Sequence, residues 1–171
     1  MNGPRLRRLQ NEYEGMLELA QTSSLISFSS RGQPPVRYEI VFTCEGLMRI
    51  GSEVYRTAEH LFTISLDDTF PMLPPSLVWR TRVFHPNIKP PSVCTGDIWY
   101  PALSLAELCI ALCELVQYKQ FNIYSALDTD AATWLYGQLQ SENPSIPVDR
   151  RPVLDREFEI EVLPRAGDSP Q

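Results

Sequence analysis

Lysine is almost missing from this chain of 171 residues: only Lys89 and Lys119 occur, against thirteen arginines. Arginine keeps the positive charge but is never a free amine nucleophile at neutral pH. A protein that carries an amine-reactive acyl group would benefit from this composition. Codon bias in a GC-rich genome explains it at least as well, so both explanations stay open.

Long apolar runs are also missing. No stretch approaches the ~18 uninterrupted apolar residues of a membrane span, and no charged-then-apolar leader marks a signal peptide. We therefore expect a cytoplasmic protein without a membrane partner. The net charge of −6 argues against a nucleic-acid partner, and an apolar content of 43% is typical of one globular domain.

Cysteine is sparse, with four residues and no Cys-x-x-Cys pair. This number and spacing indicate neither a zinc site nor a disulfide scaffold. Cys109 and Cys113 are four residues apart on a predicted helix. A two-cysteine metal clip is conceivable there, but core packing is favoured because free cysteine is commonly buried.

The apolar pattern predicts an α+β fold with an antiparallel sheet covered on one side. A first helix begins near Pro4, with a stripe of apolar residues at helical spacing: Leu6, Leu9, Tyr13, Leu17 and Ala20. Strands are predicted at 36–43, 47–50, 60–66 and 77–83, with a possible short strand at 25–28. Ser104 and Glu107 form a capping box for a second helix, and a third helix begins near Asp128 and ends before Pro144.

The tail has a different composition. We divide the chain into a domain at 1–142 and a proline-rich, charged C-terminal extension at 143–171. Within the extension, residues 158–163 alternate like a strand, and the last residues are expected to be disordered.

The segment from Phe84 to Cys94 carries the most information about chemistry. It places Asn87 seven residues ahead of Cys94, across a loop stiffened by prolines at 86, 90 and 91. An amide NH₂ group is a hydrogen-bond donor. A donor held near a thiol suits acyl transfer through a thioester, because negative charge develops on the carbonyl oxygen under attack.

In their order along the chain, these features resemble the ubiquitin-conjugating enzymes from about Arg5 to Leu139. The resemblance is carried by the Phe-Pro-x-x-Pro-Pro loop at 70–75, the segment around His-Pro-Asn at 82–88, the later Cys94, and Pro-Ala-Leu at 101–103 before the capped helix. Each motif alone is weak, but four in order with fitting spacing are strong. The implied fold has an N-terminal helix, a four-stranded antiparallel meander and C-terminal helices.

The resemblance implies a transferase that accepts ubiquitin or a ubiquitin-like protein from an activating enzyme as a thioester and passes it to an amine, often with a ligase. On this reading Cys94 is the nucleophile, Asn87 supports the oxyanion or the loop that shapes the site, and His85 is mainly structural. Ser125 matches the gate position of the family. No metal or organic cofactor is needed, because the modifier arrives already activated.

Two surfaces are implied for partners. The first helix would dock the activating enzyme, with a basic cluster at Arg5, Arg7 and Arg8. Without the resemblance, that cluster is simply a solvated face. Met72, Pro101 and Ala102 match the two loops that usually meet ligases.

The chain departs from the family pattern on both sides of Cys94, where the intervals from His-Pro-Asn to Cys94 and from Cys94 to Pro101 are shorter than usual. These deletions indicate a divergent member, and we hypothesise a prokaryotic conjugation system. Two rival functions remain. One is a catalytically silent relative that binds a modifier or steers a partner. The other is a cysteine hydrolase with His85 as base, which lacks an obvious third residue to orient the histidine ring.

Overall fold

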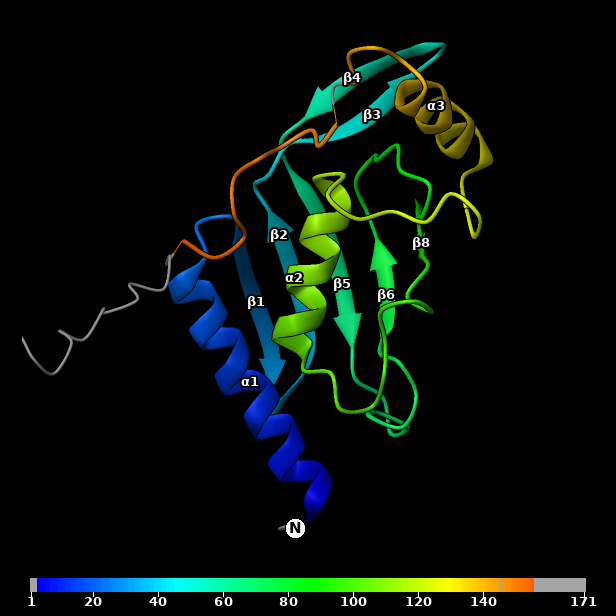
Figure 1. Ribbon diagram of the computed structural model, residues 1–171. Helices are drawn as coiled ribbons and strands as arrows, with labels where there is room; N and C mark the ends of the chain where they lie inside the picture. Colours follow the sequence, from blue (N-terminus) through cyan, green and yellow to red (C-terminus); the bar gives the residue numbers. More distant parts are fainter. Residues whose placement is uncertain (1–2, 145, 156–171) are drawn as a thin grey trace, which may run out of the picture.

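The computed structural model describes residues 3–144 and 146–155 (Figure 1). Its four-stranded antiparallel sheet has the order β1-β2-β5-β6, with strands Ile26–Gly32, Pro35–Phe42, His60–Ser65 and Ser76–Trp79. Helix α1, Pro4–Thr22, packs against β1, β2 and α2, Leu105–Val116. Figure 1 shows α1 beside β1 and α2 crossing in front of the sheet. The predicted fold class is confirmed.

The sheet uses a different set of strands from the one that the pattern predicts. The short strand at 25–28 is a full sheet member, β1, and pairs with β2 along its length. The predicted strand at 47–50 belongs instead to a separate hairpin, in which β3, Gly46–Ile50, pairs with β4, Glu53–Thr57. This hairpin lies beside α3, Thr129–Leu139, at the top of Figure 1.

Strand β6 ends at Trp79, earlier than the predicted 83. The reason is local: the Leu61 N–H donates to the Thr81 hydroxyl at 3.1 Å, so a side chain replaces a main-chain acceptor there. The chain then enters a small hairpin of β7, Ile88–Lys89, and β8, Ser92–Val93. This hairpin leads directly to Cys94.

The main core lies between the sheet and the helices. Strands β2 and β5 and helix α2 each bury an apolar face, and residues from all three share one apolar cluster that includes Ile40, Phe62 and Leu108. Val36, which the alternation places on the same side of β2 as Ile40, is exposed instead. The predicted face of α1 is wrong in part. Leu17 is exposed, and the buried residues of α1 are Leu9, Glu12, Met16 and Leu19.

Both later helices begin where the sequence predicts. Ser104 and Glu107 form the reciprocal capping box of α2, and the Asp128 side chain accepts two N–H groups at the start of α3. Within residues 3–144 and 146–155, no helix is both long and apolar enough to cross a bilayer.

Part of the predicted extension packs on the body. Val148 and Val153 are buried, the Val148 N–H donates to the Gln117 carbonyl at 2.9 Å, and the Asp155 N–H donates to the Thr22 carbonyl at 2.8 Å. The segment 146–155 therefore bridges the end of α2 and the end of α1. The predicted strand at 158–163 and the predicted disordered end lie outside the described residues.

Candidate active site around Cys94

Cys94 follows β8 at the open end of the β7–β8 hairpin. Its N–H donates to the Asn87 carbonyl at 2.9 Å, which extends the hairpin register by one further pair. The thiol lines a hollow of about 130 Å³ together with other residues of the same region: Asn87, Asp97, Ile98, Leu115, Gln120, Phe121 and Asn122. The site is thus built from the hairpin, the segment after it and the chain that follows α2.

The four cysteines differ in accessibility. Cys94 is partly exposed, whereas Cys44, Cys109 and Cys113 are fully buried in the main core. Burial, with a smaller effect of Glu12, raises the pKa of the Cys109 thiol. A contact with the Cys44 thiol, at 3.8 Å between the sulfur atoms, and burial together raise the pKa of Cys113. Of the four thiols, only that of Cys94 is accessible for nucleophilic attack.

Asn87 is buried and holds the loop after α2 in place. Its amide NH₂ donates to the carbonyls of Asn122, at 2.8 Å, and Ser125, at 3.2 Å. Its amide oxygen accepts the Asn122 N–H at 2.8 Å. Both amide hydrogens are therefore engaged with the main chain of the loop. This geometry favours the loop-shaping alternative for Asn87 over direct donation to an oxyanion.

Asn122 and Asp97 complete the network, and sequence reasoning assigned neither of them a role. The Asn122 amide oxygen accepts the N–H groups of Tyr124, at 2.9 Å, and Ser125, at 3.2 Å, as asparagine often does in turns. Its NH₂ group donates to Asp97 at 2.7 Å across the hollow. For Asn122, the only indication in the sequence is that asparagine commonly occurs in turns such as the one at 122–125. Nothing in the sequence pairs it with Asp97.

His85 is fully buried beneath the site. Its Nδ1 accepts the Asn87 N–H at 3.0 Å, and its ring packs on Tyr118 with centroids 4.6 Å apart. Burial lowers the pKa of His85 to about 3, against a smaller opposing effect of the Gln120 carbonyl. The ring is therefore neutral near pH 7, and its Nδ1 lone pair is occupied. This environment favours a structural histidine over a general base.

Ser125 follows Asn122, a residue of the hollow, by three positions. It is exposed, and its main chain is held by the side chains of Asn87 and Asn122. Its neighbour Tyr124 is 95% exposed. The four predicted catalytic positions, Cys94, Asn87, His85 and Ser125, are thus brought together in one region.

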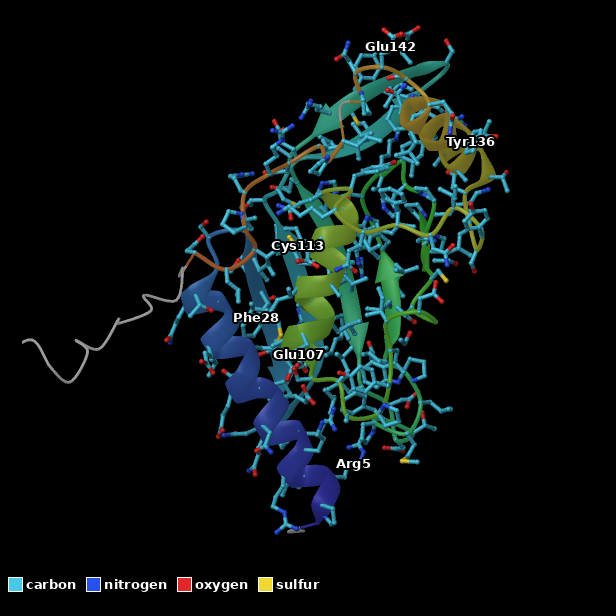
Figure 2. All side chains as sticks on the ribbon, viewed as in Figure 1. Arg5, Phe28, Glu107, Cys113, Tyr136 and Glu142 are labelled. Carbon is cyan, nitrogen blue, oxygen red and sulfur yellow. The ribbon has the colours of Figure 1, made fainter. Side chains whose placement is uncertain are left out.

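The three arginines predicted for docking lie at the start of α1 but do not behave alike. Arg5, labelled in the lower part of Figure 2, donates to the Asp67 carbonyl at 2.6 Å. Arg8 donates to the carbonyls of Pro101, at 3.0 Å, and Leu103, at 2.7 Å. Arg7 is exposed. The default prediction of a uniformly solvated face is therefore wrong for Arg5 and Arg8, which tie α1 to two neighbouring loops.

Those two loops carry the other predicted partner positions. Met72 is 74% exposed, and Pro101 and Ala102 are also exposed. Leu73 and Tyr100 add further exposed apolar surface beside them. The loops lie near the N-terminal half of α1, toward the foot of Figure 1.

Comparison with known proteins identifies the family of this chain. The family model described as ubiquitin-conjugating enzyme matches residues 8–143. The chain belongs to the ubiquitin-conjugating enzyme family.

A curated relative agrees with this assignment. Ubiquitin-conjugating enzyme E2 16 of Schizosaccharomyces pombe is 31% identical over 86 residues, which cover 47% of this chain and 52% of the relative. The chain thus matches about half the length of that curated relative.

Two solved structures share the fold. Ubc12 of S. cerevisiae matches with a TM-score of 0.60 and 23% identity, over 79% of this chain and 70% of that one. The E2 domain of a Toxoplasma gondii ubiquitin conjugating enzyme matches with a TM-score of 0.55 and 15% identity, over 75% of this chain and 86% of that one.

Proposed function

We propose that this protein accepts ubiquitin or a ubiquitin-like modifier from an activating enzyme as a thioester on Cys94 and transfers it to an amine. The observation that carries the proposal is the accessibility of the thiols. Cys94 alone among the four cysteines is not buried, and it lines the hollow that Asn87 and Asn122 border. Membership of the ubiquitin-conjugating enzyme family supports the same reaction class.

The chemistry consists of two acyl transfers. The Cys94 thiolate attacks the incoming thioester and displaces the activating enzyme's thiol, and an amine then attacks the new thioester and releases Cys94. The first exchange is nearly balanced in energy, so the protein contributes mainly positioning. The network of Asn87, Asn122 and Asp97 fixes the wall along which the amine approaches.

The partner surfaces follow from the same proposal. The activating enzyme docks on α1, with Arg7 exposed for contact, and a ligase meets the loops with Met72, Pro101 and Ala102. Two aspartates near the start of α3, Asp128 and Asp130, are engaged within the protein rather than with a partner. Asp128 caps the helix, and Asp130 pairs with Arg49 at 2.8 Å.

Two rival functions are weighed against this one. A silent scaffold requires no reactive thiol. It therefore leaves the accessible Cys94 beside a preformed hollow unexplained. A cysteine hydrolase requires a base for the thiol. His85 is a poor base because it is buried, its pKa is lowered to about 3, and its Nδ1 already accepts the Asn87 N–H.

One experiment separates the three functions. The protein is mixed with ubiquitin, ubiquitin-activating enzyme and ATP, and the products are resolved on gels with and without reductant. We expect an adduct that thiols cleave and that Cys94→Ala abolishes. Thermal unfolding of Cys94→Ala provides the folding control, since this partly exposed side chain is not part of the core. The absence of any adduct would favour the scaffold, and cleavage of ubiquitin conjugates would favour the hydrolase.

A further inference from the structure

One of the two lysines lies on the hairpin that carries Cys94. Lys89 ends β7 and pairs with Ser92 of β8, across the turn formed by Pro90 and Pro91. The same register pairs Ile88 with Val93, and the Cys94 N–H bond to the Asn87 carbonyl continues it. Lys89 is therefore two residues from Asn87, which is the cross-strand partner of Cys94.

The pairing also decides which side chains share a face. Side chains alternate along a strand, and directly paired residues point to the same side of a hairpin. Ile88 is fully buried and Val93 packs against the main core, so that pair faces inward. By this alternation the pairs on either side of it, Lys89 with Ser92 and Asn87 with Cys94, face the opposite side, where the loop 122–125 covers Asn87. Lys89 and Ser92 are exposed on that side, and Cys94 is partly exposed.

Lys89 is thus a diagonal neighbour of Cys94. Diagonal neighbours in an antiparallel pair have Cβ atoms roughly 7–8 Å apart, a gap that long side chains span. Lysine carries its amine on a flexible four-carbon stem. Within residues 3–144 and 146–155 we find no hydrogen bond or ion pair that ties the Lys89 amine to another group. By contrast, the Lys119 amine donates to the Arg151 carbonyl.

We propose that Lys89 is a self-modification site, which receives the modifier directly from the Cys94 thioester of the same molecule. The proposal rests on the proposed thioester function. The proposal also bears on the scarcity of lysine. Of the two lysines, Lys119 is tied to the main chain of the packed segment 146–155, and Lys89 lies on the hairpin that leads to Cys94.

The step balances without an oxidant or a further reactant. The neutral Lys89 amine attacks the thioester carbonyl carbon, an amide C–N bond forms and the C–S bond breaks. Cys94 leaves as a thiolate, and the proton released by the nitrogen goes to that thiolate or to water. The thiol is regenerated, but the bulky modifier is then attached at the mouth of the site. We expect the modified molecule to be recharged more slowly than the unmodified one.

Intramolecular attachment gives the reaction its kinetic signature. A group held by a short flexible tether has an effective concentration on the order of millimolar. Self-transfer should therefore compete with added free lysine until that lysine reaches a similar concentration. Its rate constant should not change when the protein is diluted, and it should rise with pH because only the neutral amine attacks.

The test starts from protein charged with ubiquitin, after charging has been stopped with EDTA. The charged protein is incubated without added amine, and the products are resolved with reductant. We expect a thiol-resistant adduct, mapped by peptide mass spectrometry to Lys89, that is lost in Lys89→Arg. The matched variant Lys119→Arg should form it in full, and Cys94→Ala should form neither adduct.

The outcomes distinguish this inference from the proposed function. If the wild-type protein forms no thiol-sensitive adduct, both proposals fall. If the thioester forms and discharges to free lysine, but no adduct appears on Lys89, only the self-modification site is overturned. Charged wild-type protein is also mixed with tagged, uncharged Cys94→Ala protein. Modification confined to the tagged chain would overturn transfer within one molecule.

Discussion

At the scale of single residues, the site depends on one buried amide more than on any charged group. Asn87 donates to two carbonyls of the loop 122–125 and accepts one N–H from it, and its own N–H donates to His85. The residue therefore connects the His-Pro-Asn segment to the wall of the hollow beside Cys94. An unpaired buried polar group costs about 1–3 kcal/mol, so this arrangement resists distortion.

We predict that Asn87→Ala leaves thioester formation largely intact and slows discharge to lysine by roughly 10²-fold, the cost typical of a misplaced reacting group. The loop 122–125 loses three side-chain hydrogen bonds in this variant, so the wall that guides the amine is no longer fixed. Single-turnover discharge of charged protein measures the effect. Asn11→Ala, an exposed asparagine on α1, is the control. An unchanged discharge rate in Asn87→Ala would remove this residue from the mechanism.

The sequence singles out residues of the candidate site but not the contacts between them. Cys94 and Asn87 stand out because a short proline-rich interval joins them, so they are close whatever the rest of the chain does. Asn122 and Asp97 come from segments that only folding brings together. A polar residue with such a distant partner carries no periodic or spacing signal, which is why the sequence gives this pair no role.

At the scale of elements, a buried carboxylate joins the first two helices. Glu12 of α1 is 2% exposed, accepts the Leu105 N–H of α2 at 2.5 Å and forms an ion pair with Arg8. The first N–H groups of a helix have no partner within the helix, so Glu12 acts as a cap supplied by a distant element. Arg8 in turn binds the loop that precedes α2.

We predict that Glu12→Ala destabilises the fold by about 1–3 kcal/mol, because the buried carboxylate is the acceptor for the partly exposed Arg8 guanidinium. The Leu105 N–H also loses its acceptor. Urea unfolding followed by circular dichroism gives the free energy of unfolding. Glu14→Ala, on the exposed side of the same helix, should change it by no more than about 0.5 kcal/mol. Equal effects of the two substitutions would contradict a capping role for Glu12.

Glu12 also explains why the face of α1 was predicted incorrectly. Periodicity assigns apolar residues to the buried side, which selects Leu17 and excludes a glutamate. The actual buried face includes Glu12 because the start of α2 lies against it. The hairpin β3–β4 shows the same limit, since the predicted strand at 47–50 forms but pairs with β4 rather than with the four-stranded sheet.

At the scale of the whole molecule, both the described part of the extension and the core contain buried titratable groups. Burial alone would raise the pKa of Asp149, but hydrogen bonds from the Arg151 side chain and from the N–H groups of Glu45 and Arg151 outweigh it and lower the pKa to about 2. His60 is fully buried in the sheet, and burial lowers its pKa to about 4. His85 behaves in the same way beneath the site.

We predict that acid destabilises the protein in two stages. The folded pKa values of His60 and His85, about 4 and about 3, lie below the ordinary histidine value near 6.5. The unfolded chain therefore binds more protons below pH 6.5. The stability that each histidine contributes is complete above that pH and is lost as the pH falls toward its folded value. At pH 5 each loses about 2 kcal/mol. Asp149 adds a second loss, from about pH 4 down to about 2.

Urea unfolding at pH 7.5 and at pH 5 tests the first stage directly. The wild-type protein should lose about 4 kcal/mol between these two conditions, the sum for two independent histidines. His60→Gln should be less stable at pH 7.5, because the site is shaped for an imidazole, but it should lose only about half as much on acidification, since glutamine does not titrate. A wild-type stability that stays level from pH 7.5 to pH 5 would contradict this prediction. An undiminished loss in His60→Gln would instead assign the proton uptake to other groups.

His85 makes its contribution from beneath the Asn87 network, so we expect the hollow beside Cys94 to loosen in the same pH range in which the sheet does.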